Sequence, residues 1–308
     1  MKVYKENKYS NKKAKRLKTI KKRIVVLTGL GIVVLCGINI AKTYAEEDNT
    51  KIVITTEDKK NSENKAQNTK IAVDTIIDPF KIGSGGVREV NDCLYGPLGR
   101  YFYEYAEAYG VDPNLMCAIA MQESSLNHKA CIPGGYMYSG YGVGLMQLES
   151  PSGKKISAYN YKTGQVDIEY ITMEAACDPI KNIKIGCMLF QNSLNYNNGN
   201  PLLAIQAHNF GQGMVDLVLS DAYGNFDAIK NDYANFEWVK YMKDAHENPW
   251  KYLSGWDESK YGDGEYVNNV LRFFPVDKIK YNYDGKRICL NLKTMKVESQ
   301  VDLNSKVR

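Results

Sequence analysis

Apolar residues are spread unevenly along the chain, and their pattern divides it into distinct stretches. Residues 24–41 are an uncharged apolar run of about the length that crosses a bilayer. Residues 42–86 are rich in Glu, Asp, Lys, Asn and Thr, which is the composition of a disordered linker. From residue 87 onward apolar residues recur with a helical period, so we expect the folded part to begin there.

The folded part is expected to be mainly helical. Helices are predicted where apolar positions repeat at three- and four-residue spacing after a capping residue. Asp112-Pro113 and Asp178-Pro179 are two such starts, because Asp caps a helix and Pro is tolerated at its first position. The predicted helices cover residues 94–108, 113–125, 179–196, 201–210 and 266–273.

A β-hairpin is predicted near the C-terminus. Asp284-Gly285 is a favoured two-residue turn between two short alternating runs. The apolar residues expected on one face of the hairpin are Ile279, Tyr281, Ile288 and Leu290. There is no regular alternation of strands with helices and no internal repeat, so a parallel sheet is not expected.

Glu123 is the residue that the pattern singles out. In the helix expected at residues 113–125, Leu115, Ile119 and Glu123 lie four residues apart and share one face. A carboxyl group held against apolar surface is disfavoured as an anion and keeps its proton more readily, which suits a general acid. The alternative is a glutamate of the last helical turn that points into solvent.

The charge distribution argues against a nucleic-acid-binding protein. The formal net charge is +5, but residues 1–23 hold eleven Lys or Arg and one acid, Glu6, so the remainder is mildly acidic. No basic stripe with interleaved aromatic residues occurs there. The basic tail instead flanks the apolar run at residues 24–41, which predicts a cytoplasmic tail and an external domain. The run is either an uncleaved anchor or a signal sequence that is removed near Ala45.

Four short motifs occur in order: Gln122-Glu123-Ser124, Gly144-Leu145-Met146-Gln147, Ala207-His208-Asn209-Phe210-Gly211 and the weaker Tyr266-Val267-Asn268-Asn269-Val270. With Asp178-Pro179 and Asn182-Ile183 before the third, this series resembles the soluble lytic transglycosylase and goose-type lysozyme superfamily (SLT-like domain). It resembles in particular the membrane-tethered lysozyme-like branch. The resemblance covers roughly residues 87–274 and implies a lysozyme-like helical fold.

The resemblance also implies roles for single residues. It makes Glu123 the catalytic acid/base. The residues that it places along the substrate or beside this acid are Ser124, Met146, Gln147, His208, Asn209 and Tyr266. Amide side chains can both donate to and accept from sugar hydroxyls, and Met146 supplies an adaptable apolar wall. The family usually has tyrosine where this chain has His208, and a histidine there either contacts the substrate or is a satisfied structural residue.

The implied reaction is cleavage of the β-1,4 bond between N-acetylmuramic acid and N-acetylglucosamine in peptidoglycan. Glu123 would protonate the glycosidic oxygen. In a lytic transglycosylase the N-acetyl oxygen of the sugar replaces a second carboxylate, and the product is a 1,6-anhydro sugar. An N-acetylmuramidase needs a second carboxylate, for which Glu149 is the nearest candidate in sequence. A third hypothesis, in which the protein is not an enzyme, is an inactive glycan-binding module.

Other chemistry is not indicated by the sequence. There is no zinc-type cysteine spacing, no phosphate loop and no dinucleotide fingerprint, so neither a metal nor a cofactor is expected. Six of the seven cysteines follow the apolar run and either form up to three disulfides or are small buried residues. The expected partners are peptidoglycan glycan strands and the membrane. Wall turnover, sporulation and a secretion or conjugation apparatus all fit as the biological setting.

The expected organisation is a mainly α, lysozyme-like helical domain with a small C-terminal β-hairpin, behind one N-terminal transmembrane helix and a disordered linker. The predicted parts are a basic cytoplasmic tail (1–23), a transmembrane anchor or signal sequence (24–41), a flexible linker (42–86), a lysozyme-like transglycosylase domain (87–274) and a hairpin extension (275–308). The expected location is the cell membrane, with a single pass and the C-terminal domain outside, or the exterior after cleavage.

Overall fold

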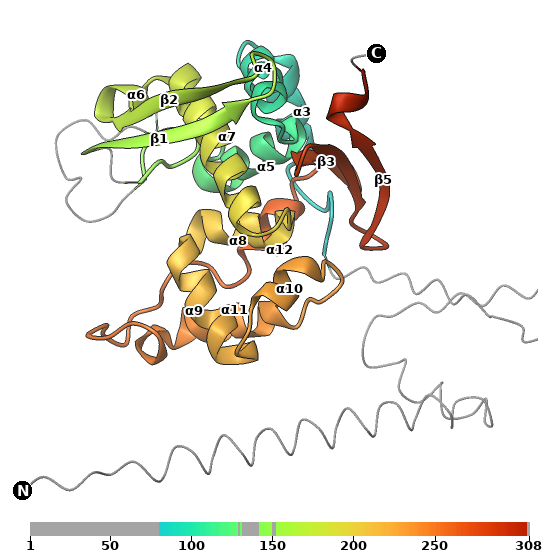
Figure 1. The fold of residues 1–308 in the computed structure, drawn as a ribbon. Helices are drawn as coiled ribbons and strands as arrows, with labels where there is room; N and C mark the ends of the chain where they lie inside the picture. The colour runs from blue at the N-terminus through green and yellow to red at the C-terminus, as the bar shows by residue number, and fades with distance from the viewer. Residues whose placement is uncertain (1–79, 129, 131–141, 150–151, 307–308) are drawn as a thin grey trace, which may run out of the picture. The chain divides into compact units, whose positions relative to one another are not determined.

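A computed structural model describes residues 80–128, 130, 142–149 and 152–306 (Figure 1). The chain separates into two compact units, residues 1–76 and 77–308, and all described residues belong to the second. The expected tail, the apolar run at 24–41 and the linker up to residue 79 therefore lie outside the described residues and stay predictions. Among the helices that are described, none combines the length and the apolar character needed to cross a bilayer.

The described fold is mainly helical, as predicted. The helices are α3 (Val87–Tyr95), α4 (Gly99–Tyr109), α5 (Pro113–Ser124), α6 (Met173–Cys177), α7 (Pro179–Tyr196), α8 (Pro201–Phe210), α9 (Gln212–Tyr223), α10 (Asp227–Asn231), α11 (Trp238–Glu247) and α12 (Tyr266–Leu271), with short 3₁₀ turns at Pro249–Lys251 and Leu303–Lys306. The single helix expected at residues 94–108 is instead two helices, because Gly96-Pro97 interrupts it. Helices α6, α9, α10 and α11 were not predicted.

Two small antiparallel sheets accompany the helices in the described part of the chain. The first is the hairpin β1 (Ser152–Asn160) and β2 (Gln165–Thr172), which the sequence analysis missed and which packs on α7. The second has the order β3-β4-β5, with β3 at Lys278–Tyr283, β4 at Lys286–Asn291 and β5 at Lys296–Asp302. The predicted C-terminal hairpin is therefore confirmed as β3–β4, and β5 adds a third strand. Its turn residues Asp284 and Gly285 both have positive φ, as a type I′ turn requires.

The packed structure begins before the boundary expected at residue 87. Phe80 is buried, and its ring packs edge-on against Phe236. The backbone N–H groups of Gly83 and Gly85 donate to the carbonyl oxygens of Leu271 and Arg272, each at 3.1 Å. Residues 80–86 are therefore joined to the end of α12 and are not part of a linker.

Helix α5 is the buried centre of the domain. It packs against α3, α4 and α12, and six consecutive residues, 115–120, are buried, so the helix is enclosed on all sides and not only along the predicted stripe. Asp112 caps its start by accepting from the N–H groups of Asn114 (2.9 Å) and Leu115 (3.3 Å). The second carboxylate oxygen of Asp112 accepts from Lys280 N–H at 2.9 Å, which ties β3 to the start of α5. Burial raises the pKa of this carboxyl, although these hydrogen bonds oppose the shift.

One buried side chain, Asn182 on α7, holds the segment at residues 142–149. Its Nδ2 donates to Val143 O (2.9 Å) and Ala176 O (2.8 Å), and its Oδ1 accepts from Met146 N–H (2.8 Å). Gly144 lies directly against this amide with φ of 78°. A Cβ atom at Gly144 would lie 2.2 Å from Asn182 Nδ2, so only glycine fits there.

Replacing Gly144 by alanine should therefore cost more than backbone strain alone. Gly224, at the end of α9, is a matched control because its φ is 75° and nothing lies within 4 Å of its ideal Cβ. Alanine at either position incurs about 1–3 kcal/mol because the backbone has a positive φ. We expect Gly144→Ala to lose about 1–3 kcal/mol more, because the clash forces a rearrangement of the core. Urea unfolding of both variants measures the difference, and equal losses would show that the contact with Asn182 is unimportant.

Candidate active site

Glu123 lies at the C-terminal end of α5, and its carboxylate meets a tyrosine from α12. The hydroxyl of Tyr266 donates a hydrogen bond to Glu123 Oε1, which joins residues 143 positions apart in the sequence. Tyr266 is buried, and the Glu123 side chain is 15% exposed. Burial, followed by the charge of Glu123, raises the pKa of Tyr266 well above its ordinary value. The hydroxyl therefore keeps its proton and serves as a fixed donor to the carboxylate.

His208 occupies the same site. Its Nε2 lies 3.2 Å from the carbonyl oxygen of Met146, and because a carbonyl only accepts, this nitrogen carries the hydrogen. The same Nε2 lies 3.9 Å from Glu123 Oε1. The imidazole also stacks on the Tyr266 ring, with centroids 6.3 Å apart and planes 18° from parallel. The residue that departs from the family pattern thus contacts both the segment at 142–149 and the candidate acid.

The remaining sequence-predicted site residues make mostly structural contacts. Ser124 Oγ donates to Ala120 O (3.1 Å) within α5, and Gln147 Nε2 donates to Gly144 O (2.8 Å). Asn209 Oδ1 accepts from Asp263 N–H (2.6 Å) and so holds the segment that leads into α12.

Met146 requires a correction. Its side chain is fully buried and fits against the space left by Gly186, where an added Cβ would lie 2.7 Å from Met146 Cγ. The side chain therefore belongs to the core and does not form the glycan wall expected from the resemblance. What Met146 contributes to the site is its backbone carbonyl oxygen, which binds His208.

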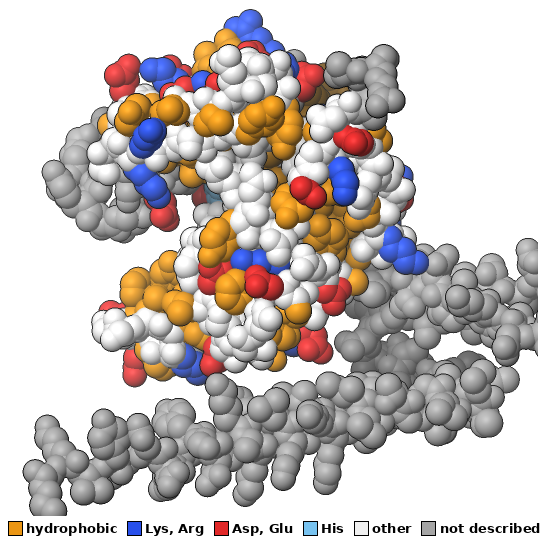
Figure 2. All heavy atoms as spheres, in the orientation of Figure 1, with side chains coloured by type: hydrophobic (Ala, Val, Ile, Leu, Met, Phe, Trp, Pro, Cys, Tyr) orange, Lys and Arg blue, Asp and Glu red, His pale blue; other side chains and the backbone are white. Residues whose placement is uncertain are grey.

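The surface is hollowed between two parts of the domain, one carrying the hairpin β1–β2 and the other carrying α9 and α11 (Figure 2). Glu149 is exposed, and its charge contributes, after burial, to a raised pKa of Tyr261. Tyr261 in turn donates to Phe210 O at 3.0 Å, at the end of α8. Glu149 therefore acts on Tyr261 through its charge, whereas Glu123 is contacted by Tyr266 and His208.

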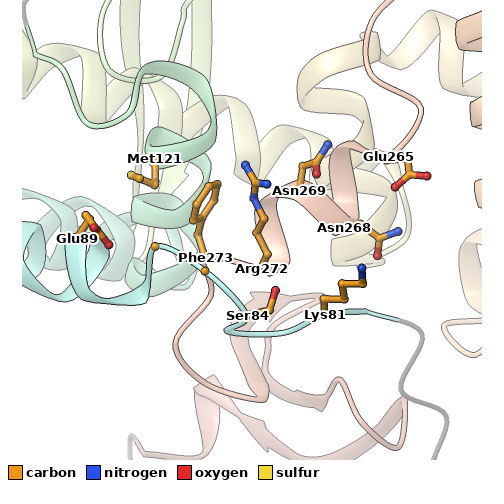
Figure 3. A pocket seen from close by; sticks show the side chains of 11 residues that line it. Lys81, Ser84, Glu89, Met121, Glu265, Asn268, Asn269, Arg272 and Phe273 are labelled. Carbon is orange, nitrogen blue, oxygen red and sulfur yellow. The ribbon is translucent and has the colours of Figure 1, made fainter. Parts of the chain in front are cut away.

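A separate pocket of about 650 Å³ does not include the candidate acid (Figure 3). Its lining comes from the segment before α3, from α3 and α5, and from α12 with the residue before it and the two after it. The lining comprises Lys81, Ser84, Gly85, Gly86, Glu89, Met121, Glu265, Asn268, Asn269, Arg272 and Phe273. Met121 precedes Glu123 by two residues, and Asn268 follows Tyr266 by two, so each lies on roughly the opposite side of its helix from the site residue. The pocket lining includes neither Glu123 nor Tyr266.

The described side chains suggest no metal centre and no disulfide. Over the described ranges no three His, Cys, Asp or Glu residues are grouped in a way that could hold a metal ion. The five described cysteines are free thiols: Cys93, Cys117, Cys177, Cys187 and Cys289. Cys117 and Cys187 are buried, which fits the interpretation as small core residues, whereas Cys36 and Cys131 lie outside the described residues.

Sequence reasoning did not foresee how Asn182 and Gly186 support the site. Asn182 was recognised only as part of a motif, yet it fixes the backbone whose carbonyl binds His208. The available signal was a polar residue on the buried side of an otherwise apolar helix, since such an amide must find hydrogen-bond partners inside the fold. Gly186 gave a weaker signal. A glycine in the middle of a helix often indicates that a neighbouring segment packs closely against it.

Comparison with known proteins agrees with this geometry. A family model described as Transglycosylase SLT domain matches residues 100–229. A curated relative, the bifunctional muramidase/DL-endopeptidase CwlT of Bacillus subtilis (strain 168), is 24% identical over 174 residues, which are 56% of this chain and 39% of the relative. The chain thus spans well under half the length of that relative. Comparison with solved structures gave no match. Residues 100–229 therefore match the transglycosylase SLT domain family, which belongs to the lysozyme-like superfamily.

Proposed function

We propose that this protein cleaves the β-1,4 bond between N-acetylmuramic acid and N-acetylglucosamine in peptidoglycan, as a lytic transglycosylase with one catalytic carboxyl group. The observation that carries the proposal is the partly buried Glu123, held by Tyr266 at the end of α5 within the SLT domain. The similarity to a relative named as a muramidase supports the same class of bond.

The contacts of Glu123 suggest how it would work. Tyr266 and His208 both contact Oε1, so Oε2 is the oxygen left to carry a proton toward the substrate. Glu123 would donate this proton to the glycosidic oxygen as the bond breaks, and would then recover one from the C6 hydroxyl of the sugar. The N-acetyl oxygen of the substrate would stabilise the positive charge at the anomeric carbon in the meantime. Substrate hydroxyls and amides would bind to Gln147 Oε1 and Asn209 Nδ2, the amide atoms that are not used in the hydrogen bonds to Gly144 and Asp263.

The alternative is hydrolysis by an N-acetylmuramidase, which the name of the relative favours. A hydrolysing enzyme needs a second carboxylate, about 5–5.5 Å from the first when it acts as nucleophile or about 6.5–9.5 Å away when it activates water. Glu149 is the candidate, but its described electrostatic neighbour is Tyr261. The second alternative is an inactive glycan-binding module, and the placement of Glu123 argues against it.

The product of the purified protein separates these alternatives. We expect mass spectrometry of muropeptides released from isolated peptidoglycan to show 1,6-anhydro ends, which are lighter by one water than the reducing ends that hydrolysis leaves. Glu149→Gln should cleave at a rate within about twofold of the wild type, because the proposed mechanism uses no second carboxylate. Reducing ends, or a folded Glu149→Gln protein without activity, would favour the muramidase. No release by the wild-type protein would favour the binding module.

We further propose that the domain acts outside the cell on a single-pass membrane anchor at residues 24–41, with peptidoglycan strands as its partner. Wall turnover, sporulation and service to a secretion or conjugation apparatus are all compatible with this placement. The support is the apolar run and its basic flank, since such flanks stay in the cytoplasm.

Limited proteolysis tests this topology. Protease added to protoplasts should digest the region after Ala45 and spare residues 1–23, because only the former would be outside. An epitope tag at each end of the chain reports the two regions separately. Protection of the SLT domain together with digestion of the N-terminal tag would reverse the proposed orientation.

A further inference from the structure

The hairpin β1–β2 presents apolar side chains to solvent. Successive residues of a strand point to opposite sides, and Val166, Ile168 and Tyr170 of β2 all point outward, with exposed fractions of 61%, 50% and 53%. Tyr159 of β1 lies opposite Val166 and extends the same surface. Figure 2 shows hydrophobic side chains gathered over this hairpin. These four residues are called the hairpin face below.

The inner side of β2 carries two acidic residues, Asp167 and Glu169, before the buried Ile171, whereas an inner side is usually apolar throughout. Asp167 accepts hydrogen bonds from Tyr109 (2.8 Å) and from the Asn160 side chain (2.9 Å), and Glu169 pairs with Lys184 at 2.5 Å. Because a shift of one residue in register would move every side chain to the other side, these contacts fix the apolar residues outward. The hairpin face is thus an enforced feature of the fold.

Positive charge accompanies the hairpin face. Lys155 lies opposite Tyr170 on the same side of the hairpin, and it forms no ion pair with a described residue. Lys154 lies opposite the buried Ile171, beside the irregularity at the start of β1, and is exposed. The acidic residues of the two strands, Asp167 and Glu169, both point inward. Aliphatic, tyrosine and unpaired lysine side chains together are the combination that suits the interfacial region of a bilayer with anionic headgroups.

We propose that the hairpin face docks on a lipid bilayer that contains anionic lipids, with Val166 and Ile168 among the headgroups. An anionic wall polymer would satisfy the lysines but would leave the aliphatic side chains in water, whereas a bilayer interface accommodates both. The chain supplies a second argument. Residues 42–79 separate the expected anchor from Phe80, so anchoring would hold the hairpin face at high effective concentration near a membrane, where weak docking suffices.

A tryptophan placed on the hairpin face reports docking directly. Full-length Ile168→Trp would be reconstituted into vesicles of equal parts phosphatidylcholine and phosphatidylglycerol with brominated acyl chains, which quench tryptophan at the interface. The matched control is Tyr95→Trp, at an 88% exposed position on α3. The wild type gives the background of Trp238, Trp250 and Trp256. We expect the added signal to fall by about half at position 168 and to be unchanged at position 95, because only the hairpin face enters the headgroup layer.

Two further variants complete the test. Val166→Trp provides a second reporter, and circular dichroism checks that each variant is folded. Lys154→Glu with Lys155→Glu, added to Ile168→Trp, should reduce the quenching at least about twofold, because the attraction to anionic lipid is lost. Equal quenching at positions 168, 166 and 95 would overturn the proposal. Absence of quenching together with a dimer in sedimentation that Ile168→Asp abolishes would assign the hairpin face to a second copy instead. The effective concentration provided through residues 42–79 rests on the proposed anchor. None of these outcomes depends on glycan cleavage, so the proposed enzymatic activity is tested separately.

Discussion

The contact between Tyr266 and Glu123 is the interaction on which the rest of the candidate site depends. It joins the end of α5 to the start of α12, and it fixes one oxygen of the carboxylate while leaving the other available. A hydrogen bond to a charged group contributes about 1.5–3 kcal/mol, so this bond is strong enough to set the orientation of the side chain. Because burial keeps Tyr266 protonated, it remains a donor whether or not Glu123 carries a proton.

The supports of this pair come from distant parts of the chain. Asn182 fixes the segment at 142–149, and the carbonyl of Met146 in that segment binds His208, which stacks on Tyr266. On the other side, Asn209 holds the backbone at Asp263 just before α12. At the far end of α5, Asp112 both caps the helix and binds β3 through Lys280. The C-terminal sheet thus supports the helix that carries Glu123, a role that the sequence left open.

Local signals in the sequence predicted the elements with strong caps and turns. Asp112, Asp178 and Asn200 each cap the helix that was expected after them, and Asp284-Gly285 forms the expected hairpin turn. The prediction failed where the structure depends on distant contacts. Asp167 and Glu169 of β2 can face inward because Tyr109 and Lys184 bind them there. Both partners are distant in the sequence, so no local pattern predicts these contacts.

The candidate site was predicted in the same uneven way. The placement of Glu123 on a largely buried helix followed from periodicity, whereas its meeting with Tyr266 came only from the resemblance, since spacing cannot relate residues so far apart. The burial of the Met146 side chain depends on the space at Gly186, a property of packing between α7 and a loop. The motif indicated that this segment belongs near Glu123, but it did not indicate that the Met146 side chain is buried and that its backbone carbonyl oxygen contacts His208.

The most direct measurement of the central claim is the rate at which purified Glu123→Gln protein releases muropeptides from isolated peptidoglycan. The amide fills the same space and can still accept from Tyr266, but it has no proton to donate, so the rate should fall by about 10²–10⁴-fold with an unchanged fold. Glu174→Gln, at an 89% exposed side chain on α6, is the matched control and should retain the wild-type rate. Equal rates for the wild type and Glu123→Gln would contradict the assignment of Glu123 as the catalytic acid.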